Sequence, residues 1–284
     1  MEWKNRRKSD NVEDRRGSKA PATIGGIGGI GIIIVIIYTL MGGNPGDILG
    51  GTSGTPQVKT ETAGDYKPSK EEEEISEFVQ VILADTEDVW HDVFEKEGKT
   101  YKDPTLVLYT NSVASACGNA TKAVGPFYCP GDQKLYIDLS FYDELRTQYK
   151  APGDFAMAYV VAHEVGHHVQ TLLGQTQKVH AQNGRVSKKA YNELSVKLEL
   201  QADYYAGVFA KHVQDRGYLD EKDFKEALTA ANAIGDDTLQ KRAQGYVVPD
   251  SFTHGTSAQR MKWLERGFKY GDLQNGDTFN ARDL

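Results

Sequence analysis

The segment AHEVGHHVQ, residues 162–170, constrains the fold of this chain more than any other part of the sequence. His163 and His167 stand four positions apart with Glu164 between them, inside a run of small and apolar residues that predicts a buried helix. Because positions i and i+4 share one face of a helix, both imidazoles can bind one metal ion from the same side. This H-E-x-x-H pattern is typical of Zn²⁺ ligands, and the glutamate is placed to take a proton from a zinc-bound water. The pattern predicts a zinc-dependent hydrolase and favours peptide bonds as its substrate.

A catalytic zinc site needs a third protein ligand, so that water can hold the fourth position. The apolar segment SVKLELQADYYAGVFAKHVQ predicts a second long helix, which carries Glu199 and, one turn later, Asp203. We expect Glu199 to complete the ligand set for one Zn²⁺ per chain; Glu193 is the weaker alternative. We expect Asp203 to accept the free ring N–H of one zinc-bound histidine, with His163 the first choice, because such a carboxylate fixes the tautomer of the ligand.

Segments spread over nearly the whole length resemble the membrane-anchored neutral zinc metallopeptidases of bacteria. They are KSDNVEDRRGS near the N-terminus, the block from GPFYCP to LYIDLSFYD, the AHEVGHHVQ helix, LELQAD and VVPDSFTHGTSAQR. The resemblance implies zinc peptidase activity with no assigned substrate, and a metal site of the gluzincin type. In that site His163, His167 and Glu199 would bind zinc and Glu164 would be the base. Many members of the family carry a cysteine where this chain has Tyr204, a position outside the metal set.

A fainter similarity concerns the sequence SFTH at residues 251–254 and the arginine that follows it at position 260. It resembles the S-T-H-P…R segment of the CAAX-prenyl-protease class of gluzincins, although Gly255 replaces the proline. By analogy, His254 and Arg260 are expected to donate hydrogen bonds to the tetrahedral intermediate and stabilise its oxyanion. The alternative is that His254 caps or packs against the following helix.

Residues 24–41, IGGIGGIGIIIVIIYTLM, form an uncharged apolar stretch of eighteen residues. As a helix this stretch would span about 27 Å, close to the thickness of a bilayer core. A buried strand is the alternative, but strands are rarely so long. No A-x-A-like cleavage site follows, so we expect a single transmembrane helix that anchors the protein to the membrane. Gly25 and Gly29 form a G-x-x-x-G pattern, a weak indication of oligomerisation through this segment.

The charge distribution predicts a topology for that helix. Residues 1–23 carry seven basic side chains against four acidic ones, whereas the whole chain has a formal charge of −7. A basic run can bind nucleic acid, but here it precedes an apolar stretch, so we expect a cytoplasmic tail and no nucleic-acid partner. The remainder would lie in the periplasm or at the cell surface. There Cys117 and Cys129, the only cysteines, would form a disulfide; as zinc ligands they would lack a second pair.

The remaining pattern divides the chain into a flexible linker, residues 42–70, and a zinc metallopeptidase domain, residues 71–284. Strands are predicted at residues 105–110 and 134–140, and most of the rest is helical in pattern. We therefore expect an α+β, zincin-like catalytic domain that is mostly helical with a small sheet. Residues 134–140, KLYIDLS, are the candidate edge strand for pairing with an extended peptide or protein substrate. The rival hypothesis is a non-catalytic zinc-binding or peptide-binding scaffold of the cell envelope; Glu164 favours catalysis, because a purely structural site needs no base.

Overall fold

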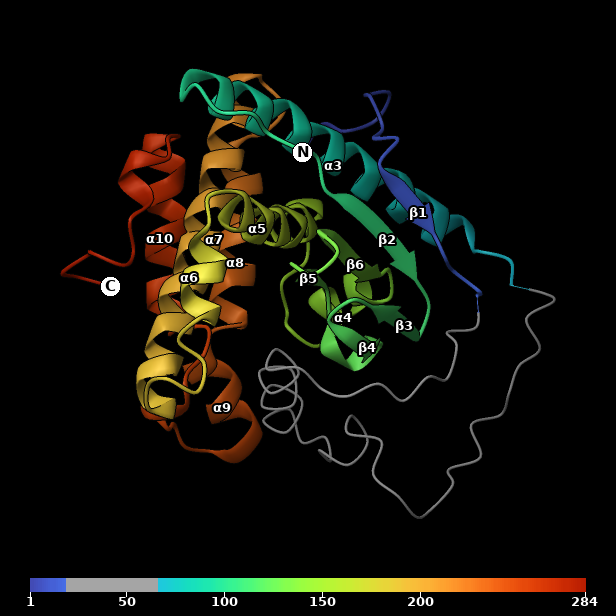
Figure 1. Ribbon diagram of the computed structural model, residues 1–284. Coiled ribbons are helices and arrows are strands. Elements are labelled where there is room, and N and C mark those ends of the chain that lie inside the picture. Colours follow the sequence, from blue (N-terminus) through green and yellow to red (C-terminus); the bar gives the residue numbers. More distant parts are fainter. Residues whose placement is uncertain (19–65) are drawn as a thin grey trace, which may run out of the picture.

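The computed structural model describes residues 1–18 and 66–284. In Figure 1 a small sheet lies on the right, the long helices α7 and α10 lie on the left, and α5 lies between them. The described helices are α3 (Lys70–Lys96), α4 (Phe141–Thr147), α5 (Asp154–Leu172), α6 (Gln175–His180), α7 (Lys188–Asp215), α8 (Glu221–Ala233), α9 (Asp236–Gln244) and α10 (Ser257–Tyr270), with short 3₁₀ turns at η1 (Lys122–Val124), η2 (Pro249–Ser251) and η3 (Gln274–Gly276). The strands are β1 (Val12–Asp14), β2 (Thr105–Tyr109), β3 (Ser112–Ser115), β4 (Gly118–Thr121), β5 (Phe127–Cys129) and β6 (Lys134–Asp138). The expected α+β fold with mostly helical content is the one observed.

The main sheet has the strand order β1-β2-β6-β5. β1 and β6 both pair with β2 in parallel, and β5 pairs with β6 antiparallel, so β5 is the edge strand on the side of α5. The sequence predicts residues 134–140 as that edge strand, and this prediction is wrong: β6 lies between β2 and β5. β2 and β6 are buried almost throughout, as expected for inner strands covered on both faces.

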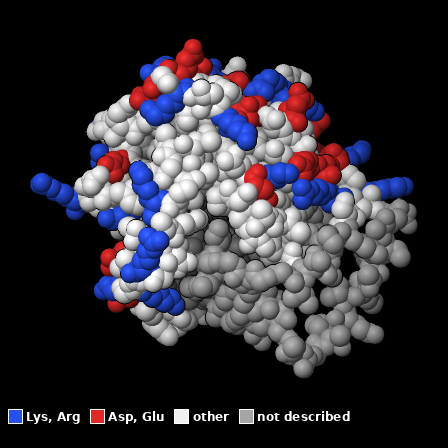
Figure 2. Space-filling view, in the orientation of Figure 1, with Lys and Arg blue, Asp and Glu red and all other residues white. Residues whose placement is uncertain are grey.

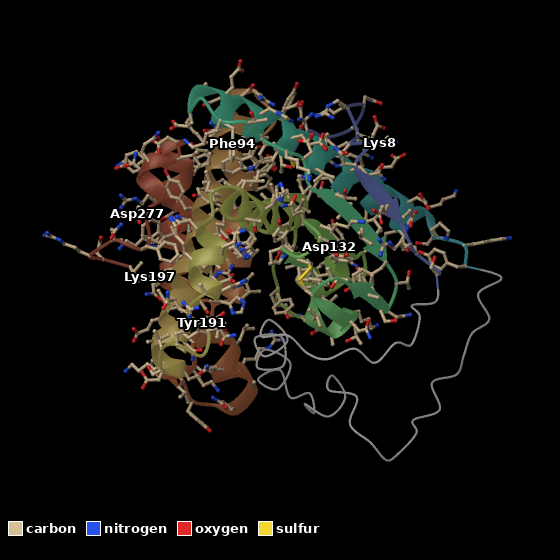
Figure 3. All side chains as sticks on the ribbon, in the orientation of Figure 1. Lys8, Phe94, Asp132, Tyr191, Lys197 and Asp277 are labelled. Carbon is tan, nitrogen blue, oxygen red and sulfur yellow. A yellow bond between two sulfur atoms is a disulfide. The ribbon has the colours of Figure 1, made fainter. Side chains whose placement is uncertain are left out.

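The predicted disulfide between Cys117 and Cys129 is present. It joins the turn of the β3–β4 hairpin to the end of β5, and Figure 3 shows it beside Asp132. The Asp132 carboxylate accepts hydrogen bonds from the Ala116 N–H, at 2.9 Å, and from the Tyr136 hydroxyl, at 2.7 Å. The hairpin, the edge strand and β6 are thereby held together around one covalent link.

Helix α5 is the centre of the fold. It packs against α3, α7 and α8 and against β5 and β6, and every residue from Phe155 to Thr171 except His167 is buried. A helix that is apolar nearly all round is buried on all sides, which matches its sequence. At Gly166 the helix comes close to α7, since a Cβ on this residue would lie 3.0 Å from the Ala202 carbonyl oxygen. This close approach brings the polar residues of α7 up to the histidines of α5.

Helices α7 and α10 also meet with their backbones in contact. A Cβ on Gly207 would lie 2.1 Å from the Leu264 carbonyl oxygen, and one on Gly267 would lie 1.9 Å from that of Tyr204. Only glycine fits at these two positions, because any side chain would overlap backbone atoms of the other helix. The crossing sets Arg260, two turns before Gly267, beside the middle of α7.

Residues 1–18 belong to the folded unit, which differs from the prediction of a separate basic tail before a domain that starts at residue 71. β1 extends the sheet, Trp3 is buried against Phe78, and Arg6 pairs with Asp85 of α3. Arg7 adds ion pairs with Glu87, at 2.9 Å, and Asp88, at 2.7 Å. Figure 2 shows acidic and basic side chains side by side at the top of this face, where Figure 1 places α3 and the N-terminal segment. The basic residues of the segment thus complement the acidic residues of α3.

The prediction of a single-pass membrane protein requires correction. Among residues 1–18 and 66–284, no helix combines the length and the apolar character needed to cross a bilayer. Residues 24–41, with Gly25 and Gly29, lie outside the described residues, as does most of the expected linker. A cytoplasmic tail cannot pack against a domain on the other side of a membrane, yet residues 1–18 pack against α3 and β2. The expected topology, in which a membrane separates an N-terminal tail from the folded domain, is therefore wrong.

Candidate metal centre

His163 and His167 from α5 and Glu199 from α7 form one cluster, and their ligand atoms all lie within 4.8 Å of one another. His163 Nε2 is 3.2 Å and His167 Nε2 is 3.6 Å from the same oxygen, Glu199 Oε2. Tetrahedral ligands with bonds of about 2.1 Å to zinc lie about 3.4 Å apart, so this spacing suits the ion. Two imidazoles and one carboxylate are also a donor set that zinc prefers.

The alternative third ligand, Glu193, does not join the cluster. Its side chain is exposed, and of the described residues only His163, His167 and Glu199 form a group able to hold a metal ion. Glu193 precedes Glu199 by six positions, which turns it away from the face of α7 that meets α5. Glu199 and Asp203, four positions apart, share that face.

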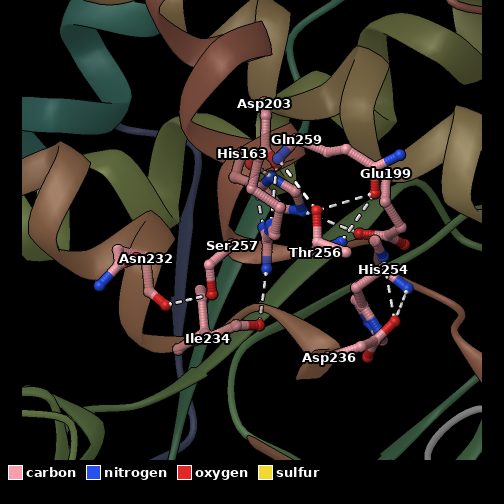
Figure 4. Close-up of polar contacts among 12 residues, drawn as sticks. His163, Glu199, Asp203, Asn232, Ile234, Asp236, His254, Thr256, Ser257 and Gln259 are labelled. Carbon is pink, nitrogen blue, oxygen red and sulfur yellow. Dashed lines mark hydrogen bonds and ion pairs between the residues drawn. The ribbon is translucent and has the colours of Figure 1, made fainter. Parts of the chain in front are cut away.

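Behind His163 stands a buried carboxylate. Asp203 is fully buried, and its Oδ1 lies 2.8 Å from His163 Nδ1 (Figure 4). Because a carboxylate accepts, the ring carries its proton on Nδ1 and leaves Nε2 for the metal. This is the contact that the sequence predicts for Asp203. The Tyr159 hydroxyl donates a further hydrogen bond to the same oxygen, at 2.6 Å.

Arg260 lies behind Asp203, on the side away from His163. Its guanidinium donates from Nε to Asp203 Oδ2, at 2.8 Å, and from Nη2 to Oδ1, at 3.0 Å. Nη2 also donates to the Tyr159 hydroxyl, and Nη1 donates to the Ile234 carbonyl oxygen. The sequence predicts that Arg260 contacts the reaction intermediate; in the structure it bonds Asp203, Tyr159 and the Ile234 backbone. Arg260 is therefore linked to His163 through Asp203.

His254 approaches the cluster from the loop between η2 and α10. One oxygen of Asp236 accepts from three consecutive backbone N–H groups, those of residues 253–255, at 2.7, 2.7 and 3.0 Å. The other oxygen of Asp236 lies 3.5 Å from His254 Nδ1, which also hydrogen-bonds the Thr253 hydroxyl at 2.9 Å. Burial lowers the pKa of His254, but Glu199 and Asp236 outweigh this effect and raise it. The Glu199 carboxylate thus acts on the pKa of His254, whose Nδ1 is engaged by Thr253 and Asp236. Figure 4 shows Asp236 beside His254.

Glu164 lies beside the ligands on α5 with 9% of its surface exposed. Burial raises the pKa of its carboxyl group, although His167 and His163 oppose the rise. The backbone of Tyr128, on edge strand β5, also lowers the pKa of this carboxyl group. The Tyr128 hydroxyl meets His168 Nδ1 at 3.0 Å, and His168 Nε2 donates to the Lys102 carbonyl oxygen at 2.6 Å. His168 therefore ties β5 to the Lys102 backbone.

Electrostatics keep the two carboxylates of the cluster ionised, as metal binding requires, and favour the protonated form of His163 beside them. Burial would raise the pKa of Glu199, but His167, His254 and His163 outweigh it and hold the pKa well below its usual range. Burial likewise raises the pKa of Asp203, while Arg260 and His163 bring it down to about 2. Burial lowers the pKa of His163, but Asp203 and Glu199 raise it to about 10. Both carboxylates are therefore ionised, and a metal ion between the two helices would replace the Nε2 protons of the imidazoles.

A second polar side chain behind the ligands was not found from the sequence. Gln170, one turn after His167 on α5, places its Oε1 2.9 Å from His167 Nδ1. The only signal in the sequence is a glutamine three positions after the second histidine of the motif, on the same helical face.

Comparison with known proteins also indicates a zinc peptidase family. A family described as "Putative neutral zinc metallopeptidase" matches residues 1–279. The chain belongs to this family. The relatives include "Uncharacterized protein YpfJ" of Escherichia coli (strain K12), 49% identical over 285 residues that cover 98% of this chain and 99% of the relative. "Uncharacterized protein Rv2575" of Mycobacterium tuberculosis is 37% identical over 256 residues, 86% of each chain. No solved structure is significantly similar to this chain.

Proposed function

We propose that this protein is a zinc-dependent peptidase that hydrolyses bonds within peptide or protein substrates. The observation that carries the proposal is the position of Glu164, a buried carboxylate on the same helix as two ligands and one residue from His163. Zinc bound by His163, His167 and Glu199 would supply a Lewis acid that activates water and polarises the scissile carbonyl. The family membership supports the choice of metal and the class of substrate.

Each residue around the proposed zinc ligands has a distinct chemical role. Glu164 takes the proton of the attacking water and later gives it to the leaving amine, for which a raised pKa is suited. His254, its Nδ1 engaged by Thr253 and Asp236, uses Nε2 to donate to the oxygen of the tetrahedral intermediate. Asp203 holds the tautomer of His163, and Arg260 holds Asp203.

The substrate is proposed to lie along β5. This strand ends the sheet of the described residues and packs on α5, and its Tyr128 backbone lowers the pKa of Glu164. An extended peptide that adds to such an edge is held by main-chain hydrogen bonds with its scissile bond across the metal. β5 takes the role that the sequence assigns to residues 134–140.

The proposal is tested by cleavage of a mixed peptide library, read by mass spectrometry, with the zinc-loaded full chain and its Glu164→Gln variant. We expect the parent to cleave and the variant to lose activity by a factor of about 10² to 10⁴, with equal zinc content, because only the proton acceptor is lost. Equal cleavage by both proteins would contradict the role of Glu164. Zinc bound by both with no cleavage by either would favour the rival, a zinc-binding or peptide-binding scaffold.

A further inference from the structure

Gln170 is fully buried at the interface of α5 and α7 and uses both ends of its amide. Oε1 lies 2.9 Å from His167 Nδ1. Nε2 lies 2.6 Å from the Leu198 carbonyl oxygen and 3.2 Å from Gln201 Oε1. Leu198 directly precedes the ligand Glu199, so one side chain touches a ligand of α5 and the backbone beside a ligand of α7.

The partners of the amide fix the direction of each hydrogen bond. A backbone carbonyl can only accept, so the NH₂ group of Gln170 must face Leu198 and its oxygen must face His167. An amide oxygen also only accepts, which requires a proton on His167 Nδ1 and leaves Nε2 with its lone pair directed at the cluster. Asp203 imposes the same tautomer on His163 with a charge. Gln170 imposes it on His167 with a neutral group.

A further residue holds the amide itself. Gln201 is buried, and its Nε2 donates to the Gly276 carbonyl oxygen at 2.9 Å, so its oxygen faces Gln170. Gly276 ends η3 and packs against the Tyr204 ring, where a Cβ would lie 2.6 Å from the ring carbon Cδ1. The hydrogen bonds therefore run in one direction, from His167 through Gln170 and Gln201 to the C-terminal segment.

We propose that Gln170 is a positioning residue of the zinc centre, which presets the tautomer and ring orientation of His167 and ties them to α7 and η3. The inference rests on the proposed zinc site but not on the reaction catalysed there. Partners of this kind behind a ligating histidine change metal affinity by a factor of about 10 to 100.

The test is zinc affinity, measured by competition with a chromogenic chelator and without any substrate. In Gln170→Met the side chain keeps its length but loses all three hydrogen bonds, and we expect zinc affinity to fall about 10-fold to 100-fold. Gln240→Met is the matched control, because Gln240 is equally buried and also uses both amide ends, on Ser251 and the Val248 N–H. We expect the control to keep the parent affinity. Melting curves of the metal-free proteins verify that both variants fold.

A conservative variant separates the hydrogen bond from general packing. Glu at position 170 still offers an oxygen to His167 in either protonation state, so Gln170→Glu is expected to recover most of the affinity that Gln170→Met loses. Equal affinities for Gln170→Met and Gln240→Met would overturn the proposal, and so would a Gln170→Glu variant as weak as Gln170→Met. A parent that binds zinc but cleaves no peptide would refute the proposed function alone, whereas a parent that binds no zinc would refute both.

Discussion

At the scale of single residues, the metal centre depends on charges buried in pairs. Asp203 and Arg260 are both at least 97% buried and are joined by two hydrogen bonds. Each neutralises the other, and together they give His163 a fixed acceptor. Such a pair is costly to break, because the partner left behind is an uncompensated buried charge.

This pairing predicts non-additive effects on stability. Asp203→Asn and Arg260→Met should each lower the free energy of unfolding of the metal-free protein by about 3–5 kcal/mol. The double variant should lose clearly less than the sum, since no charge is then left unpaired. Urea unfolding of the four proteins measures the coupling. Strictly additive losses would show that the two side chains stabilise the fold independently.

The sequence groups site residues that lie within one turn of the same helix. His163, Glu164 and His167 share a helical turn, and Glu199 and Asp203 share another, so periodicity alone sets each group on one face. The position of Arg260 behind Asp203 depends on the α7–α10 crossing, which leaves no periodic trace in sequence. Gln170 was missed because a buried amide in an apolar helix looks the same whether its partner is a ligand or a backbone group.

At the scale of elements, the crossing of α5 and α7 sets the distance between the ligands. Gly166 meets the Ala202 backbone at this crossing, so Gly166→Ala must push the helices apart by a few tenths of an ångström. We expect a stability loss of about 1–3 kcal/mol together with a fall in zinc affinity. Gly207→Ala, at the α7–α10 crossing, is the comparison: its larger overlap should cost more stability for a smaller change in affinity. Loss of stability without any loss of zinc affinity in Gly166→Ala would contradict this account.

The edge strand is stabilised by a covalent link. Cys129 follows Tyr128 on β5 and closes a loop of twelve positions to Cys117. Replacing both cysteines with serine should lower the free energy of unfolding by about 3 kcal/mol, as expected for a loop of this size. Denaturant unfolding of the variant beside the parent, with and without a reducing agent, checks this value. A parent that is insensitive to the reductant, with its disulfide shown to be reduced, would contradict it.

The order of the strands could not be predicted, and the reason is physical. The buried runs of β2 and β6 are visible in the sequence, but β5 and β1 have three residues each and no clear alternation. Their places depend on pairing between distant segments, such as residues 12–14 with 106–108. Propensity does not encode such pairing, because the same short strand fits several neighbours.

At the scale of the whole molecule, the N-terminal segment and α3 close one side of the fold through charge pairs. Asp85 of α3 lies in this interface with 5% of its surface exposed, and Arg6 is its partner. Burial raises the pKa of Asp85 to about 6, even though Arg6 opposes the rise. The folded state thus binds this proton more tightly than the unfolded state, where the pKa is 3.8.

The raised pKa of Asp85 sets how the free energy of unfolding changes with pH. With the folded pKa above the unfolded one, ionisation of Asp85 costs stability as pH rises from about 4 to about 6. The stability of the parent relative to Asp85→Asn should therefore fall over this range, by on the order of 2 kcal/mol. Unfolding free energies of both proteins between these pH values measure the difference, in which the other groups cancel. A constant difference would show that Asp85 has an ordinary pKa in the folded protein.

The central claim is that α5 and α7 build a zinc site with three protein ligands and one open position. Diffraction data from crystals of the zinc-loaded full chain, collected on both sides of the zinc absorption edge, test it most directly. We expect one anomalous peak bonded to His163, His167 and Glu199, with a water in the fourth position beside Glu164. A fourth protein ligand, or a peak elsewhere with these three side chains empty, would contradict it.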